Sequence, residues 1–595
     1  MLNPTLPQLF RRLWVHFTTQ RRAQLGLLFV VMVLASLAEV VSIGAILPFL
    51  GAVTAPDRVF LHPMAQPLIQ ALSLTEPKQL LLPLTIAFAT SALLSGLMRI
   101  ILLWALTRLS HAIGADFGIS IYRRTLFQPY SVHVLRNTSE VISGISKKTD
   151  GVVNRTLVPM LIICSSFVMM VFVLFALLSI DPIVAISAFG GFGAIYIMVI
   201  SATKKALFRD GQRLNNDSNQ VIKILQEGLG GIRDVLIDGT QSTYCNSYRH
   251  AELSLRRAEA NIQIISGLPR YGIESLGMVL IATLAYSLAG SPSGITDAIP
   301  VLGALALGAQ RLLPVLQQSY ASWSLIRGNQ AILRGTLDLL DQPLPGYADA
   351  PPLSAIPFKH GITLNNLAFK YTEDTPWVLQ SGLNLSIPKG SRTGFIGATG
   401  SGKSTLLDII MGLLQPTKGS LAIDDVNITE DNHRGWQAHI AHVPQAIFLS
   451  DASIAENIAF GEPAEQIDYA RVSQAAQNAQ ISETIESWSK QYNTVVGEQG
   501  VRLSGGQRQR IGIARALYKQ ADVIVFDEAT SALDNDTERA VMEAIENLGN
   551  ELTVIIVAHR LTTLKNCTQI VELKDGRIRR SGSYEKIIGL QANHE

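Results

Sequence analysis

Gly397-Ala398-Thr399-Gly400-Ser401-Gly402-Lys403-Ser404-Thr405 is the stretch that decides the fold of the second half of this chain. It matches the pattern G-x-x-x-x-G-K-S, in which the glycines let backbone N–H groups turn inward around phosphate. Residues 393–396, just before it, predict a short buried strand, and residues 406–411 predict a helix with an apolar face. Strand, loop and helix in this order predict a phosphate-binding loop at the positive end of a helix, rather than an ordinary glycine-rich turn.

The same half carries residues suited to hydrolysing a nucleotide. Lys403 can reach the β- and γ-phosphates, and Ser404 can ligate Mg²⁺. Residues 523–526 form a continuous apolar run typical of a parallel strand buried on both faces. Asp527 and Glu528 follow this run. Asp527 is placed to hold Mg²⁺ through water, and Glu528 to orient or deprotonate the attacking water.

Four further positions are candidate parts of this site. Tyr371 can stack on adenine, or it is an aromatic residue at the edge of a strand. Gln445 can reach Mg²⁺ or the attacking water, and His559, at the end of a second apolar strand, can contact the γ-phosphate. Leu503-Ser504-Gly505-Gly506-Gln507 is a second glycine turn before a predicted helix at 508–516. Its backbone and serine donors can bind phosphate.

The composition of the chain indicates a membrane portion. Hydrophobic residues make up 48% of the 595 residues and charged residues 16%, against about 25% charged in soluble proteins. A net charge of +2 is too small to argue for a nucleic-acid partner. Cys164, Cys245 and Cys567 are far apart, so we expect neither a disulfide framework nor a metal cluster. The first apolar run is too long for a cleavable signal peptide.

Six apolar stretches before residue 325 are long enough to span a bilayer, although buried helices of a large soluble protein are an alternative. They lie at about 25–50, 80–106, 157–180, 182–202, 275–289 and 298–316. The chain is therefore predicted to contain an all-α six-helix transmembrane domain (1–340), a proline-rich linker (341–357) and a P-loop α/β domain (358–595).

The segments around these spans predict orientation and further helices. Arginines and lysines gather before the first span, between the second and third, and between the fourth and fifth, which predicts a cytoplasmic N-terminus and α/β domain. Helical spacing in 107–156 and 203–267 predicts helices that continue out of the membrane. Their turns, at 128–137 and 230–239, are candidate contacts for the nucleotide domain. Residues 68–72 form either a short amphipathic helix or a simple loop.

Charged residues inside the spans have two interpretations. Glu39, Arg99 and Arg311 fall within the first, second and sixth spans, and Arg270 with Glu274 opens the fifth. A charge at mid-bilayer costs about 2.5–3.5 kcal/mol, so such residues face a cavity or each other. The arginines either line a polar chamber and grip an anionic group, or Glu39 and Arg99 form an internal pair while Arg270 snorkels to the interface. For Arg311 the cavity is favoured.

The soluble half resembles the nucleotide-binding domain of ABC transporters. The residues that carry this resemblance are Tyr371, Gly397 to Thr405, Gln445, Leu503 to Gln507, Asp527, Glu528, Asp534 and His559. The resemblance implies an ATPase that uses ATP and Mg²⁺. It also implies a homodimer, in which Ser504 to Gln507 of one subunit close over ATP held by Gly397 to Thr405 of the other.

The membrane half is similar to bacterial lipid-linked oligosaccharide flippases, on Glu39, Arg99, residues 269–274 and residues 311–314. This resemblance implies export of a polyprenyl-diphosphate-linked glycan across the bacterial cytoplasmic membrane, with Arg99, Arg270 and Arg311 along the route. Export of lipid A, another lipid, a peptide or a drug is the main alternative. A different class is an ABC protein that acts as a gated channel or regulator, although Glu528 and the complete motifs favour turnover.

Overall fold

The computed structural model describes residues 4–54, 56–136, 141–142, 144–180, 182–289, 313–351, 354–529, 533–546, 551–558 and 560–588. The chain forms two compact units. The first comprises Met1–Gln128 with Arg136–Leu344, and the second Pro129–Leu135 with Pro345–Glu595.

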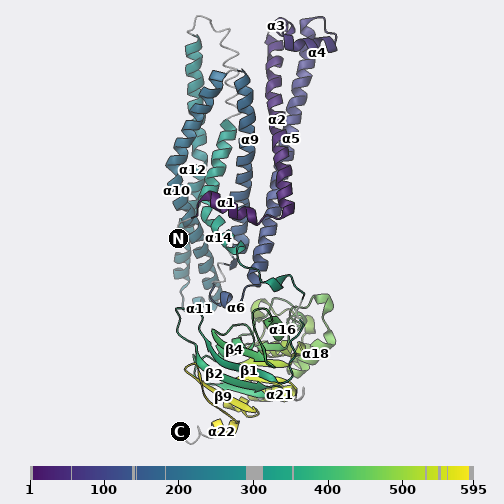
Figure 1. The fold of residues 1–595 in the computed structure, drawn as a ribbon, viewed down its shortest axis with the longest axis vertical. Helices are drawn as coiled ribbons and strands as arrows, with labels where there is room; N and C mark the ends of the chain where they lie inside the picture. The colour runs from purple at the N-terminus through teal and green to yellow at the C-terminus, as the bar shows by residue number, and fades with distance from the viewer. Residues whose placement is uncertain are drawn as a thin grey trace. The chain divides into compact units, whose positions relative to one another are not determined.

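The described residues of the first unit are helical, with short connections (Figure 1). Its α-helices are α1 (Leu6–Val15), α2 (Thr19–Thr54), α3 (Pro56–Phe60), α4 (Gln66–Ala71), α5 (Leu81–Leu126), α8 (Thr149–Val152), α9 (Val158–Ile180), α10 (Pro182–Gly230), α11 (Ile232–Ile237), α12 (Gln241–Ala289) and α14 (Gln330–Leu340). Residues 313–328 are also helical. Two segments, η3 (Gly144–Lys148) and η4 (Val153–Leu157), are π-helical.

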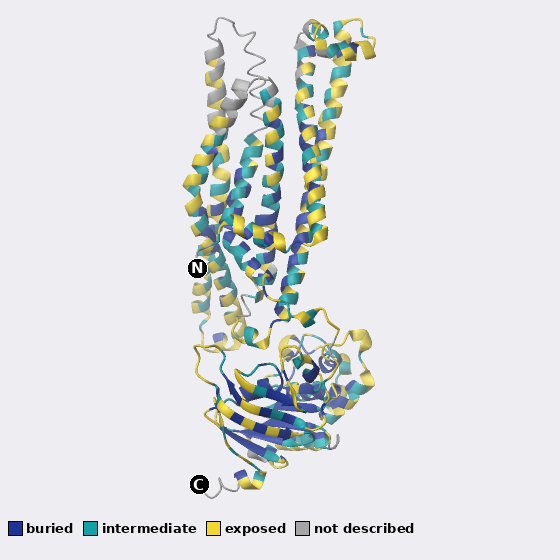
Figure 2. Ribbon diagram, viewed as in Figure 1, coloured by how far each residue is buried: buried dark blue, intermediate teal, exposed yellow. Residues whose placement is uncertain are grey.

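Within the described residues, three helical stretches are long and apolar enough to cross a membrane: Thr19–Val53, Pro77–Leu126 and Thr149–Ala176. The predicted fourth and fifth spans lie in α10 and α12, whereas most of the sixth falls outside the described residues. The helices present exposed faces, on which Leu93 and Phe175 are each 75% exposed (Figure 2). Large apolar side chains so exposed to water would be unfavourable, and lipid is the solvent that suits them.

The long helices continue past the length that a bilayer needs, as their periodicity predicted. Helices α10 and α12 have 49 residues each, or about 70 Å at 1.5 Å per residue, against about 30 Å of hydrocarbon. Helix α10 lies beside α12, and α2 beside α5. The turn predicted at 230–239 contains the short helix α11, and residues 68–72 lie in and after the helix α4 rather than in a simple loop.

The second unit holds two β-sheets. The strands are β1 (Gly361–Phe369), β2 (Leu379–Pro388), β3 (Arg392–Ile396), β4 (Lys418–Ile423), β5 (Val426–Asn427), β6 (Ile440–Val443), β7 (Val523–Asp527), β8 (Thr553–Val557), β9 (Gln569–Lys574) and β10 (Arg577–Gly582). An antiparallel sheet has the order β2-β1-β4-β5, and a larger sheet the order β10-β9-β3-β8-β7-β6. In the larger sheet all pairs are parallel except β9–β10.

The helices of this unit complete the α/β fold. They are α6 (Tyr130–Val134), α15 (Lys403–Ile410), α16 (His433–Gln437), α17 (Ile454–Ile458), α18 (Tyr469–Asn478), α19 (Ser482–Glu486), α20 (Gly505–Tyr518), α21 (Asn535–Glu546) and α22 (Tyr584–Ile588). Helix α20 extends beyond the predicted range of 508–516 at both ends. Strands β3, β6, β7, β8 and β9 of the larger sheet are largely buried, whereas β10 at its edge has no buried residue (Figure 2).

Burial of α15 holds the phosphate-binding loop in place. Leu406, Ile409 and Ile410 are fully buried against residues of β1, β2 and β3. Each such side chain contributes about 2 kcal/mol relative to remaining exposed. Because β3 leads into the loop and α15 leads out of it, the two ends of the loop are fixed by the same hydrophobic core.

The second unit also contains Pro129–Leu135, a segment separated from the rest of it by about two hundred residues of sequence. Its helix α6 lies inside the turn predicted at 128–137, which is one of the two candidate contacts for the nucleotide domain. Burial raises the pKa of Tyr130, and the charges of Asp408 and Tyr371 raise it further. Tyr130 therefore lies close to the helix that follows the phosphate-binding loop.

Candidate functional site

The phosphate-binding loop depends on glycine at three positions. Gly397, Gly400 and Gly402 have φ angles of 151°, 83° and 96°, in the region that favours glycine. A Cβ atom on Gly397 would collide with the backbone oxygen of Leu573, and one on Gly402 would come within 2.8 Å of the Leu379 side chain. The loop therefore keeps its backbone close to Leu573 and to the Leu379 side chain, which leaves no room for a side chain at Gly397 or Gly402.

Two side chains in the loop have the chemistry of phosphate ligands. Lys403 is buried, and its Nζ donates hydrogen bonds to the carbonyl oxygens of Gly397 (2.8 Å) and Ala398 (3.1 Å), which centres the ammonium over the loop. The hydroxyl oxygen of Ser401 is also buried and has no hydrogen-bond partner among the described residues. A buried, unpaired hydroxyl normally finds a partner, so this loop fits a ligand rich in oxygen acceptors.

Asp527, the acidic residue predicted to hold Mg²⁺, lies beside this loop. Burial raises the pKa of Asp527, Glu528 raises it further, and Lys403 and a hydrogen bond from Ser404 lower it. Ser404 and Asp527 are thus brought together from α15 and β7. Among the described residues, no three His, Cys, Asp or Glu side chains cluster as a metal site. Mg²⁺ takes one or two protein carboxylates and completes its shell with water and phosphate oxygens, so a hydroxyl and a carboxylate such as those of Ser404 and Asp527 suit it.

Glu528 and Gln445 form the next layer of the site. The amide Nε2 of Gln445 donates a hydrogen bond of 2.6 Å to Glu528. Glu528 has a φ angle of 53°, which is uncommon for a residue other than glycine. Its backbone N–H donates to the carbonyl oxygen of Val557, 3.0 Å away, so the neighbouring strand β8 holds this conformation. The carboxylate is therefore positioned by both backbone and side chain.

The second glycine turn forms a reciprocal helix cap. The Gln507 N–H donates to the Ser504 hydroxyl (3.2 Å), and the Ser504 N–H donates to Gln507 Oε1 (2.8 Å). This capping box sets the N-terminus of α20, where backbone N–H groups can face an anion. Asp534 also acts as a cap within this chain, because it accepts hydrogen bonds from the backbone and hydroxyl of Thr537.

Tyr371 and His559 are the remaining predicted residues of the nucleotide site. The Tyr371 hydroxyl lies 3.3 Å from the Thr405 hydroxyl, so Tyr371 stands beside the loop helix. Its ring packs edge-on against Phe369. His559 lies outside the described residues.

Asp408 is a residue of this site that the sequence analysis missed. Burial raises its pKa to about 6, with a further contribution from the charge of Asp527. It lies four residues after Ser404, and residues at this spacing share one face of a helix. That spacing was the available signal, because Ser404 and Asp408 lie one turn apart on the same face of α15.

In the membrane half, Glu39 and Arg99 form an ion pair on the wall of a cavity of about 400 Å³. Glu39 is only 1% exposed, and Ser95 donates a hydrogen bond of 2.5 Å to it. Both of the features considered for these residues, an internal pair and a cavity, are therefore present together. Arg270 is exposed and pairs with Glu274 on its own helix at 3.3 Å. Arg311 lies outside the described residues.

Comparison with known proteins agrees with these features. Residues 23–293 match the ABC transporter transmembrane region, and residues 380–531 match the ABC transporter family. The ATP-dependent lipid A-core flippase of Chromohalobacter salexigens is 32% identical over 66% of this chain and 67% of the relative. The chain belongs to the ABC transporter family.

Other comparisons cover more of this ABC transporter. The ATP-dependent lipid A-core flippase of Francisella novicida is 29% identical over 79% of each chain. A solved structure of a bacterial Atm1-family ABC exporter with ATP bound has a TM-score of 0.76 and 24% identity, and it covers 92% of this chain and 96% of that chain. This likeness shows the exporter fold: a helical transmembrane domain with an α/β nucleotide-binding domain. The protein is an ATP-driven, ATP-hydrolysing membrane exporter.

Proposed function

We propose that this transporter flips a lipid with a phosphorylated glycan head group across the bacterial cytoplasmic membrane. The observation that carries the proposal is the ion pair between the buried Glu39 and the exposed Arg99, on the wall of a cavity in the membrane half. Arg99 remains 50% exposed, so its guanidinium is accessible from the cavity while Glu39 holds it in place. A planar guanidinium suits phosphate because it can donate two hydrogen bonds at once.

A polyprenyl-diphosphate-linked oligosaccharide is the first candidate substrate, and it rests on the resemblance of the membrane half. Lipid A is the second, and it is supported by the names of the relatives, which are lipid A-core flippases. Both substrates carry phosphate on an amphiphile, as the arginine grip requires. In this proposal Arg270 and Arg311 line the same route, and the N-terminus and nucleotide-binding domain are cytoplasmic.

We propose the following roles at the nucleotide site. The loop residues Gly397, Thr399 to Ser404 and Thr405 bind the phosphates, and Tyr371 contacts adenine. Glu528 positions and deprotonates the attacking water, with His559 near the γ-phosphate. Ser404, Gln445 and Asp527 are the candidate Mg²⁺ ligands, and bound Mg²⁺ would neutralise phosphate charge.

We also infer a homodimer with the domain division given above: 1–340, 341–357 and 358–595. The turn from Ser504 to Gln507, together with Asp534, closes over nucleotide bound by the partner subunit. The capping box of α20 supports this role, because it holds the N-terminal N–H groups in a fixed position before any nucleotide arrives. Closure would then turn the membrane cavity toward the other side of the membrane.

A reconstituted flipping experiment tests the substrate. The protein is placed in liposomes with fluorescent polyprenyl-diphosphate-linked glycan or with labelled lipid A, and ATP-dependent movement to the other leaflet is measured. We expect Arg99→Ala to reduce flipping about tenfold or more while ATP hydrolysis continues, since it removes a charge-assisted contact. Because Arg99→Ala leaves Glu39 buried without its partner, the double variant E39Q/R99A separates lost substrate contact from misfolding. Unimpaired flipping by the double variant would disprove the arginine grip.

A further inference from the structure

A second cavity in the helical unit, the basic cavity, has four cationic side chains among its twelve lining residues. It has a volume of about 230 Å³ and lies between η3, α8, η4, α10, α12 and α14. Its charged lining residues are Lys147, Lys148, Asp150, Arg155, Arg256 and Glu259. Four cations against two carboxylates give the cavity a formal charge of +2. None of these residues lines the cavity that contains Arg99.

Three of the four cations lie on π-helical segments of the chain. Lys147 and Lys148 lie in the π-helical segment η3, and Arg155 lies in the π-helical segment η4. Only the single turn α8 separates the two segments. π-Helical turns are rare and less favourable than α-helix, and they occur frequently at functional sites. Here the two segments direct three cations into one cavity.

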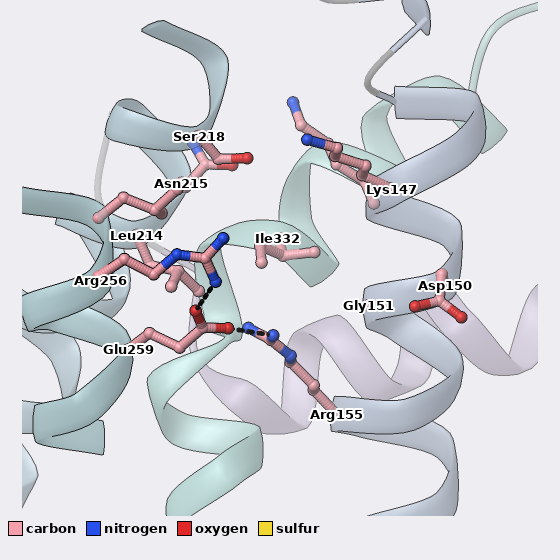
Figure 3. A pocket seen from close by; sticks show the side chains of 12 residues that line it. Lys147, Asp150, Gly151, Arg155, Leu214, Asn215, Ser218, Arg256, Glu259 and Ile332 are labelled. Carbon is pink, nitrogen blue, oxygen red and sulfur yellow. Dashed lines mark hydrogen bonds and ion pairs between the residues drawn. The ribbon is translucent and has the colours of Figure 1, made fainter. Parts of the chain in front are cut away.

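An ion-pair network holds the arginines at the cavity. Arg155 and Arg256 converge on Glu259, and Lys147 points toward the same space from another wall (Figure 3). Arg155 reaches Glu259 Oε1 at 2.5 Å, and Arg256 reaches Oε2 at 3.0 Å. Arg256 also bonds Glu252 at 2.7 Å. Since a guanidinium has five N–H donors, both arginines retain donors for a ligand after these contacts.

A polar amide adds to this lining. The Oδ1 atom of Asn215 is buried without a hydrogen-bond partner in the described part of the chain, and Asn215 lines the cavity. The O and N atoms of an amide are assigned from their partners. With the amide turned over, its N–H donors would take the place of that buried oxygen, and Asn215 Nδ2 would give up its 3.5 Å hydrogen bond to Asn216 Oδ1.

The basic cavity adjoins a less polar one. A cavity of about 410 Å³ shares Arg155 and Glu259 with it and is also lined by Ile262, Ala321 and Leu325. On α12 the basic cavity uses residues 255–259 and the second cavity residues 259–267. At 1.5 Å per residue, the two extend over about 18 Å of this helix. The ion pair between Arg155 and Glu259 thus stands at the boundary between a charged and a less polar space.

We propose that these two cavities form a loading site for a phosphorylated lipid, separate from Arg99. The phosphoryl groups bind Lys147, Lys148, Arg155 and Arg256, and the part of the lipid next to the head group lies beside Ile262 and Leu325. The inference rests on the proposed function, because it assigns that function a second site. Phosphate is favoured over a carboxylate ligand because several cations from different helices surround one small space, which suits a multiply charged anion.

Equilibrium binding to the purified full-length protein tests the loading site. The nucleotide sites are first filled with Mg²⁺ and ADP, so that added phosphate compounds do not bind there. The probes are undecaprenyl diphosphate, undecaprenol, which lacks phosphate, and inorganic pyrophosphate, and binding is followed by thermophoresis. We expect undecaprenyl diphosphate to bind more tightly than the other two, and K147Q/R256Q to weaken it about tenfold or more.

Matched variants keep this test specific. K205Q/R257Q removes the same charge from exposed positions that line neither cavity, and it should change binding less than about twofold. The conservative variant K147R/R256K should restore binding. Elution volume in size-exclusion chromatography checks that each variant is folded.

Three results of these binding experiments would overturn the inference. Equal losses in K147Q/R256Q and K205Q/R257Q, or equal binding of undecaprenol, would overturn the inference, because the phosphate would not be recognised at this cavity. Equally tight pyrophosphate binding would also overturn it, since the site would then be for a free anion. Failure of the proposed function can be told apart from failure of the loading site. In the first case E39Q/R99A would flip lipid normally while K147Q/R256Q still lost binding. If instead E39Q/R99A lost flipping while K147Q/R256Q bound undecaprenyl diphosphate normally, the proposed function would stand and the loading site would be disproved.

Discussion

Glu528 combines an uncommon backbone conformation with a hydrogen bond from Gln445. A non-glycine residue at positive φ costs free energy, and such residues persist where the surrounding structure holds them in a functional position. Here the neighbouring strand supplies that support through the backbone bond to Val557. The carboxylate can therefore meet a water molecule without first reorganising, which is what a general base requires.

Glu528→Gln should abolish turnover and leave ATP binding intact. The substitution keeps the size of the side chain and its ability to accept the Gln445 hydrogen bond, but removes the base. We expect ATP hydrolysis to fall about 100-fold or more, while ATP affinity changes only a few-fold. Steady-state hydrolysis and equilibrium binding of a fluorescent ATP analogue measure the two effects. An unchanged hydrolysis rate would show that another group activates the water.

Asp408 should make the stability of the protein depend on pH. Its pKa is raised from 3.8 to about 6 by burial and by Asp527, so the folded state holds its proton more tightly than the unfolded state. The contribution of Asp408 to stability is then most favourable below pH 4, falls as pH rises toward 6, and stays lower above it. Asp408→Asn should raise stability at pH 7.5 by about 1 kcal/mol, since partial exposure screens the penalty.

Thermal unfolding of Asp408→Asn and the unaltered protein between pH 4.5 and 7.5 measures this effect. Asp424 provides a control of opposite sign. Burial raises its pKa, but hydrogen bonds from the backbone of Gly361, Lys359 and His360 outweigh this and lower it. Asp424→Asn should therefore destabilise the protein most at neutral pH. A constant difference between Asp408→Asn and the unaltered protein at all pH values would contradict the raised pKa.

At the scale of elements, the phosphate-binding loop distinguishes two kinds of glycine. Gly397→Ala would strain the φ angle and also place a Cβ atom against the Leu573 backbone. At Gly400 an added Cβ atom has no other atom within 4 Å, so Gly400→Ala would only strain the φ angle. We expect Gly397→Ala to weaken ATP binding about tenfold or more, and Gly400→Ala to cost only about 1–2 kcal/mol of stability. Binding of the ATP analogue compares them. Equal effects would mean that the close approach to Leu573 does not shape the loop.

The sequence predicted the elements with strong local patterns. The strands β3, β7 and β8 and the helices α15 and α20 were found within a few residues, because continuous apolar runs and glycine turns bound them. Other features have no such pattern. At Asn365 and Asn366 the pairing of β1 with β2 and β4 shifts in register, and no local sequence pattern marks this irregularity. The π-helical segments keep a helical spacing of apolar residues and were therefore hidden.

At the scale of the whole molecule, the motifs identified the class of protein, but the cavities depended on side chains meeting across distant helices. Glu39 and Arg99 could be named from the cost of charge in a membrane, whereas their joint position beside a cavity required the structure. Arg155 and Arg256 lie outside the predicted spans, where charges are ordinary, so no signal marked them. Binding surfaces that assemble from several helices are in general invisible to local periodicity.

The proposed dimer predicts a cross-link that depends on nucleotide. With Cys164 and Cys245 replaced by serine, Thr399→Cys in one subunit should approach Ser504→Cys in its partner when ATP closes the nucleotide domains. Adding Glu528→Gln slows hydrolysis and should increase the closed population. We expect a disulfide-linked dimer with Mg²⁺ and ATP that is at least about fivefold more abundant than without nucleotide, read by non-reducing electrophoresis.

Cys567 can stay in place because it is buried. Pairing Ser504→Cys with Lys418→Cys, on a strand outside the nucleotide site, provides a negative control. Cross-linking that is equal with and without ATP would contradict the proposed arrangement of the two subunits.

The geometry of the loading site depends on the number of residues in the π-helical segments η3 and η4. A π-turn contains one residue more than the α-turn it replaces, so deleting a residue from either segment would restore α-helix and rotate everything after it by about 100°. One codon gained or lost at this point would swing Lys147 or Arg155 toward or away from the cavity. Substrate preference could therefore drift between related exporters by insertion and deletion, with every cation still encoded in the gene.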